Sequence, residues 1–293
     1  MNEFKSYHPI VNFIYFVFAI GFSCLFLHPV SLVISLVSGF TYYVMLKGGK
    51  KKNLIYMLLI AMVTALINPL FNHQGITIIT YLPGGNPLTM ESVIYGLCAG
   101  GMIVSVICHF SCYNEIMTSD KFIYLFGKAI PSMSLVFSMT LRFVPRFFSQ
   151  LKTVSSAQKC MGRNISEGSI KKRAECGLNI LSIMTTLALE NAIETADSMK
   201  SRGYGLPGRT AYSIYKFDKR DKIALISMLL LGAYTFIGYI IDGMYISFFP
   251  SIKTADFSIF GTSVFLAYLL LLASPVIIEV REVRSWKSSE RKI

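Results

Sequence analysis

Long runs of apolar residues, nearly free of charge, are the feature that most constrains this chain. Four runs reach the roughly 20 residues needed to cross the hydrocarbon core of a bilayer, and two others come close to that length. Hydrophobic residues make up 53% of the sequence and charged residues only 15%, which is too apolar for an ordinary soluble domain. We therefore expect an all-α integral membrane protein with about six transmembrane helices, at residues 9–27, 30–46, 54–71, 92–112, 223–241 and 257–278.

The distribution of positive charge predicts how these spans are oriented. If both termini lie in the cytosol, all but one of the 28 Lys and Arg residues fall in cytosolic segments, and the exception is Lys253. Membrane proteins retain their positive residues on the cytosolic side. We therefore predict a multi-pass plasma-membrane protein with cytoplasmic N- and C-termini, whose formal net charge of +12 faces the cytosol.

The segment between the fourth and fifth predicted spans is too long to be a simple connection. It contains two more apolar stretches, but inserting both of them would export the Lys and Arg residues between Arg142 and Arg173, against the charge rule. We expect these stretches to form long interfacial or cytosolic amphipathic helices. The predicted division is four transmembrane helices in 1–112, the cytosolic helices in 113–220, two transmembrane helices in 221–280, and a basic cytosolic tail in 281–293.

Two charged stripes are expected on these cytosolic helices. Arg142 and Arg146 are one turn apart, and Glu190, Glu194 and Asp197 form an acidic stripe on the later helix. The stripes are either two independent solvated faces, because exposed ion pairs stabilise little, or they meet where the helices cross and fix that crossing.

The stretch ADSMKSRGYG, residues 196–205, predicts a helix end with a protruding side chain. Gly203 and Gly205 can adopt the left-handed conformation that terminates a helix. Ser201 is small enough for a partner surface to approach closely, and the planar guanidinium of Arg202 suits carboxylates. Arg202 either satisfies the last carbonyl groups of its own helix or binds a partner.

Together with AQKCMGRN upstream and YHPIVNFIYF near the N-terminus, this stretch resembles the transmembrane T component (EcfT) of energy-coupling factor transporters. That family also includes the cobalt transport protein CbiQ, and the resemblance spans nearly the whole chain. In the family, two Ala-Arg-Gly-like motifs end two long coupling helices, and each motif docks into one of two ATPase subunits. The resemblance therefore implies that residues 113–220 form a coupling-helix region with two such motifs.

The two motifs do not match the family equally well. The second motif is well formed and consists of Ser201, Arg202 and Gly203. The first motif is degraded: it consists of Cys160, Met161 and Gly162, with Arg163 one residue late. Either Arg163 reaches back to replace the missing arginine, or the first site binds its ATPase through apolar contacts, with Met161 adapting to a pocket. The difference puts the equivalence of the two ATPase sites in doubt.

The function implied by the resemblance is that of a noncatalytic scaffold in an ATP-driven importer. It would transmit the motion of two cytosolic ABC ATPase subunits to a membrane substrate-binding S component that takes up a vitamin or a transition-metal ion. No nucleotide-binding loop is expected, because Gly127 and Lys128 are followed by alanine. No cofactor, metal site or nucleic-acid partner is expected either; we interpret Cys108, His109 and Cys112 as packing residues of a membrane helix.

The alternatives from other functional classes are a self-sufficient secondary transporter and a membrane anchor for a cytosolic partner. A secondary transporter usually needs ionisable side chains inside the membrane. The predicted spans carry Asp, Glu, Lys and Arg only near their ends. The energy for transport would therefore come from partner proteins, which favours the scaffold.

Overall fold

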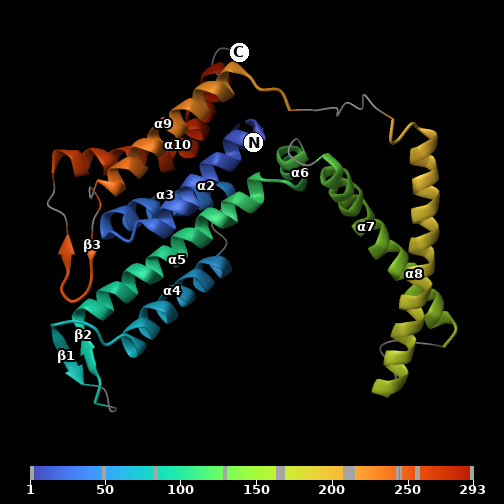
Figure 1. The fold of residues 1–293 in the computed structure, drawn as a ribbon, viewed down its shortest axis with the longest axis horizontal. Helices are drawn as coiled ribbons and strands as arrows, with labels where there is room; N and C mark the ends of the chain where they lie inside the picture. The colour runs from blue at the N-terminus through green and yellow to red at the C-terminus, as the bar shows by residue number, and fades with distance from the viewer. Residues whose placement is uncertain are drawn as a thin grey trace. The chain divides into compact units, whose positions relative to one another are not determined.

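The computed structural model describes residues 3–47, 51–81, 85–127, 131–162, 169–206, 215–241, 244, 246–254 and 258–290. These residues form helices and two short hairpins (Figure 1). The chain divides into two compact units. The first unit comprises Met1–Phe122 and Tyr215–Ile293, and the second comprises Ile123–Ile214.

The first unit contains the helices that correspond to the predicted spans, together with α1 and the start of α6, which do not. They are α1 (Glu3–Ser6), α2 (Pro9–Leu25), α3 (Pro29–Lys47), α4 (Lys51–Phe71), α5 (Met90–Ile116), the start of α6 (Ser119–Gly127), α9 (Lys219–Ile240) and α10 (Ile259–Glu290). Four of them, α3, α5, α9 and α10, are long and apolar enough to cross a membrane, and α2 and part of α4 form shorter apolar helices. Each of the six predicted spans therefore coincides with a helix, which confirms the all-α membrane fold.

One helix outside the predicted spans also has a sufficiently long apolar window. This helix is α8 (Ile170–Ser201) in the second unit, and only 17% of its apolar window is buried. Its first turn carries Lys171, Lys172 and Arg173. Its placement outside the bilayer stays a prediction that rests on this positive charge.

The core of the first unit is rich in aromatic residues, and hydrogen bonds join several of its polar groups across helices. Tyr15 is fully buried and donates a hydrogen bond from its hydroxyl to the Leu272 carbonyl at 3.0 Å. The hydroxyl of Ser35 lies 2.5 Å from the hydroxyls of both Ser23 and Ser105, so α2, α3 and α5 are linked by one polar chain. Such pairing is what allows polar side chains to remain in a dehydrated interior.

Glycine allows two pairs of helices in this unit to approach closely. A Cβ atom added at Gly100 of α5 would lie 2.8 Å from the Ala61 carbonyl oxygen of α4. At Gly238 of α9 it would lie 2.5 Å from Cγ2 of Val264 in α10. Small residues at such contacts are typical of packed membrane helices.

Two short antiparallel hairpins, which the sequence analysis did not predict, occupy connections of the first unit. Strand β1 (Ile78–Tyr81) pairs with β2 (Pro87–Thr89), and β3 (Ile246–Ser247) pairs with β4 (Lys253–Thr254). The first hairpin is attached to the start of α5, where the Glu91 carboxylate accepts hydrogen bonds from the backbone and hydroxyl of Thr77. The side chain of Thr89 caps the same helix end.

The second unit contains two long helices, α7 (Pro131–Cys160) of 30 residues and α8 of 32 residues. They pack through a small apolar cluster in which Val154 of α7 lies against Cys176, Ile180 and Met184 of α8. The helices are antiparallel, because this cluster joins the end of α7 to the first half of α8, whereas Arg146, earlier in α7, contacts Asn191 toward the end of α8. The cluster is small for helices of this length, and large apolar surfaces are left exposed on both of them.

Candidate functional site

Helix α8 ends in a Schellman motif that is built around Gly203. This glycine has a φ angle of +81°, in the left-handed region that favours glycine. Its N–H donates to the Lys200 carbonyl at 2.9 Å, and the N–H of Tyr204 donates to the Met199 carbonyl at 3.0 Å. This is the hydrogen-bond pattern that defines the motif. Backbone groups therefore satisfy these terminal carbonyls without the side chain of Arg202.

The side chain of Arg202 is exposed at this helix end. Its guanidinium forms no hydrogen bond or ion pair with any residue in the part of the chain that the structure describes. Ser201 is also exposed, and its hydroxyl donates to the Asp197 carbonyl at 2.9 Å. The neighbouring Tyr204 and Leu206 are 48% and 69% exposed. The helix therefore presents a cation flanked by apolar side chains, a combination suited to a protein surface that carries a carboxylate.

Helix α7 also ends on a glycine in the left-handed conformation, with a different side chain before it. Gly162 has a φ angle of +77°, and its N–H donates to the Lys159 carbonyl at 3.0 Å. Met161 is the residue just before this glycine, which is the position that Arg202 occupies in α8, and it is 63% exposed. The backbone therefore aligns Cys160, Met161 and Gly162 with the second motif residue by residue. Arg163 lies outside the described residues.

Among the described residues, the basic stripe reaches α8 at one point, but not at a residue of the acidic stripe. Arg146 donates from Nη2 to the amide oxygen of Asn191 at 3.1 Å, so it does reach from α7 to α8. Arg142 and the three acidic residues of the stripe are exposed. Among the described residues, neither arginine forms an ion pair with Glu190, Glu194 or Asp197. Their role in fixing the helix crossing stays a prediction.

An apolar groove lies along α7, and the sequence analysis did not identify it. Its volume is about 320 Å³, and it is lined by Thr140, Phe143, Val144, Phe147, Phe148, Leu151 and Met184. Only Met184 comes from α8. Phe148 is 64% exposed, although it is one of the largest apolar side chains in the unit. Exposed apolar surfaces of this kind mark contacts with a protein or a membrane. The signal in the sequence is the spacing of Phe143, Phe147 and Phe148, which places large apolar side chains one turn apart on a single helix.

The group of two cysteines and a histidine in α5 is part of the helix packing. His109 is buried, and its Nε2 lies 3.3 Å from the Ser35 hydroxyl. Cys108 is also buried, with its sulfur 3.8 Å from that of Met57. Within the described ranges, no three His, Cys, Asp or Glu residues are grouped as metal ligands would be.

Comparison with known proteins matches most of the chain to one family. The family model described as cobalt transport protein, CbiQ, matches residues 4–212. Three similar proteins are each named energy-coupling factor transporter transmembrane protein EcfT. Those from Lactobacillus helveticus and Bacillus selenitireducens are each 36% identical, over 36% and 34% of this chain and over 39% and 38% of their own lengths. That from Bacillus subtilis is 29% identical over 36% of this chain and 41% of its own length. The chain therefore spans about two fifths of the length of the relatives it matches.

Proposed function

The chain belongs to the cobalt transport protein family, CbiQ, and on this premise we propose that it is the transmembrane coupling subunit of an energy-coupling factor importer. In this proposal the chain is itself noncatalytic and lies in the plasma membrane with both termini in the cytosol. It binds two ABC ATPase subunits and a membrane substrate-binding S component. The complex takes up a vitamin or a transition-metal ion, and the S component selects which.

The observation that carries the proposal is the shared geometry of the two helix ends. Both α7 and α8 end on a glycine in the left-handed conformation, with an exposed side chain just before it. Two ends of one shape suit two related partners, as a pair of ATPase subunits would be. Because the backbone closes each helix by itself, the side chains of Met161 and Arg202 are available for docking.

The difference between these side chains supports unlike docking sites. The Arg202 guanidinium would pair with carboxylates in one ATPase groove, whereas the flexible thioether of Met161 would fill an apolar pocket in the other. We expect the two ATPase subunits to be different proteins or to bind with different affinities. Low ionic strength would strengthen the contact with Arg202 more than the contact with Met161.

The apolar groove on α7 supports contact between the second unit and the S component. A groove lined by Phe143, Phe147 and Phe148 presents no charged side chain to a ligand. An apolar helix of another membrane protein could fill it. Nucleotide-driven closure of the ATPases would then move α7 and α8 at their ends, and the helices would carry that motion to the S component. By linkage, occupancy of the S component must in turn alter the ATPase cycle.

The test of the proposal is substitution of Arg202 in the assembled complex. For Arg202→Ala we expect the ATPase bound at α8 to dissociate about 30-fold more readily, since a hot-spot arginine contributes about 2 kcal/mol. For Arg202→Glu the loss should be larger, because a like charge would meet the acidic groove. The measurement is the affinity of purified ATPase subunits for the membrane subunit in detergent or nanodiscs.

The matched control is Lys200→Ala, which removes one positive charge from an exposed side chain in the same turn of α8. The control should bind ATPases as tightly as the unmodified chain. If Arg202→Ala retained full affinity, or if Lys200→Ala lost as much, the docking role of Arg202 would be refuted.

A further inference from the structure

The N-terminal segment ahead of α2 contacts the chain just before and just after the second unit in the sequence. This segment runs from Glu3 to His8 and contains the short helix α1. The chain leaves the first unit after Phe122 and returns to it at Tyr215. The segment is bound by Lys121, directly before the exit, and by Arg220 and Asp221, shortly after the return. All of these contacts lie within the first unit.

The contact before the exit is made by a buried ammonium group. Lys121 is 4% exposed and donates from Nζ to the Lys5 carbonyl at 2.5 Å. The Asn12 amide satisfies both of its ends when its nitrogen donates to the Phe4 carbonyl at 3.0 Å and its oxygen accepts from Lys121 Nζ at 2.7 Å. One cation therefore joins α6 to the N-terminal segment and to the first turn of α2. A buried ammonium without these acceptors would be strongly unfavourable.

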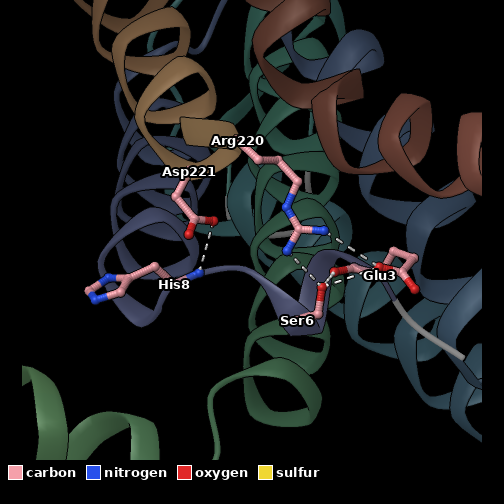
Figure 2. A network of polar contacts seen from close by, with 5 residues as sticks. All are labelled: Glu3, Ser6, His8, Arg220 and Asp221. Atoms are coloured by element: carbon pink, nitrogen blue, oxygen red, sulfur yellow. Dashed lines mark hydrogen bonds and ion pairs between the residues drawn. The ribbon is translucent and has the colours of Figure 1, made fainter. Parts of the chain in front are cut away.

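The contact after the return is made by a buried carboxylate, which Figure 2 shows beside Arg220. Asp221 is 2% exposed; its Oδ1 accepts the backbone N–H of His8 at 3.3 Å, and its Oδ2 accepts the N–H of Asp218 at 3.1 Å. The same carboxylate thus caps the start of α9 and holds the start of α2. Because Asp218 belongs to the start of α9 and only His8 lies at the start of α2, movement of α9 away from α2 would leave one oxygen of the buried carboxylate without its hydrogen bond.

The neighbouring Arg220 holds the other end of the segment. Its guanidinium carbon lies 4.2 Å from the centre of the Tyr7 ring, a cation–π distance. Its Nη2 donates to the Ser6 hydroxyl at 3.2 Å, and its Nη1 lies 3.8 Å from the Glu3 carboxylate. In Figure 2 the side chains of Arg220 and Asp221 reach different parts of the N-terminal segment from adjacent positions on α9.

From this geometry we propose that residues 3–12 act as a clasp, through which Lys121, Arg220 and Asp221 hold against α2 the two first-unit segments that precede and follow the second unit in the sequence. A force applied to α7 and α8 would reach the first unit at two points of the chain. Because one short segment holds both points, they move together with α2 and not independently. The clasp rests on the proposed coupling function and states where the motion enters the membrane helices. Lys121 and Asp221 are positioning residues in this proposal.

The test follows motion in the complete complex after a non-hydrolysable ATP analogue is added. A spin label on α2, at Val17→Cys, reports the first unit, and a second label on α8, at Leu189→Cys, reports the second unit; these two side chains are 51% and 62% exposed. Cys24 and Cys160, which are free and exposed, are replaced by serine in every variant so that the label attaches at the chosen positions. We expect both labels to respond in the chain that carries no other change. In Lys121→Met or Asp221→Asn, the α8 response should persist while the α2 response falls about threefold or more. Complexes are purified by size before labelling is measured, so that only assembled protein is compared.

The matched controls remove the same charges from exposed positions elsewhere in the first unit. They are Lys222→Met in α9 and Glu115→Gln in α5, neither of which makes a contact described for the clasp. Both controls should retain the α2 response. If the α2 label responds fully in Lys121→Met and in Asp221→Asn while the α8 label also responds, the clasp is refuted and the coupling function stands. If the α8 label fails to respond even in the unmodified complex, the coupling function is refuted and the clasp with it.

Discussion

The substitution Gly203→Ala tests whether a partner protein recognises the backbone conformation at the end of α8. Gly203 adopts a φ angle of +81°, and a Cβ atom added there would lie 3.2 Å from Cδ1 of Leu206. The leucine is 69% exposed and can move aside. The main effect of the substitution is therefore on the backbone, because an L-residue with a side chain is disfavoured in the left-handed region.

The expected size of the effect follows from that backbone preference. Holding alanine in the left-handed conformation costs about 1–2 kcal/mol, which corresponds to an affinity loss of about 5- to 30-fold if docking requires the intact turn. The free alanine variant relieves this strain by opening the turn, which would unpair the Lys200 and Met199 carbonyls and redirect Arg202. Docking would then have to restore the turn at that cost, so the affinity falls although no side chain has been removed.

The assay is a titration of purified ATPase subunits onto the membrane subunit in nanodiscs. Gly177→Ala is the control, because Gly177 lies inside α8 and has no heavy atom within 4 Å of an added Cβ. That control should leave the affinity unchanged, and it should favour the helix because alanine has the higher helix propensity. If Gly203→Ala binds ATPases as tightly as the unmodified chain, the shape of this turn is not what the partner recognises.

Two further predictions concern the first unit. Gly238→Ala should destabilise the protein by about 1–3 kcal/mol through overpacking, since the new methyl group would lie 2.5 Å from Val264 Cγ2, whereas Gly101→Ala, with open space at this position, should not lower the melting temperature. Burial, with a smaller effect from Lys5, lowers the pKa of Lys121 to about 8. Because the folded-state pKa is depressed, the unfolded chain binds more protons between about pH 8 and its ordinary value of 10.5, so this residue makes the stability rise with pH there, by at most about 1.4 kcal/mol per pH unit. The melting temperature of the unmodified chain relative to Lys121→Met should therefore increase from pH 8 to pH 9.5, and a constant difference would contradict the pKa shift.

The membrane fold could be predicted from the sequence because each span is specified locally. An apolar run of sufficient length has few stable alternatives to a membrane helix. The end of α8 was predictable for a similar reason, since Gly203 directly follows the helical pattern and specifies the turn. The chemistry of a helix end depends on a few consecutive residues, and these can be read from the sequence.

The contacts that could not be predicted from the sequence join residues far apart in the chain. Lys121 binds the backbone of Lys5, and a carbonyl acceptor leaves no side-chain pattern in the sequence. Arg146 contacts the neutral Asn191, although Glu190 is adjacent in sequence, because the rotation of α8 relative to α7 decides which side chain faces it. The β1–β2 hairpin also depends on pairing between Ile78 and Thr89, which single-strand propensity does not indicate in strands this short.

The most direct measurement of the central claim is crosslinking from position 202 in the assembled complex. A photoreactive amino acid at this position should crosslink to an ATPase subunit, and the same group at Gly177, inside α8, should not. The proposal that this helix end binds an ATPase subunit would be contradicted if position 202 gave no crosslink to an ATPase. Crosslinks only to lipid, to the S component or within the chain itself would be such a result.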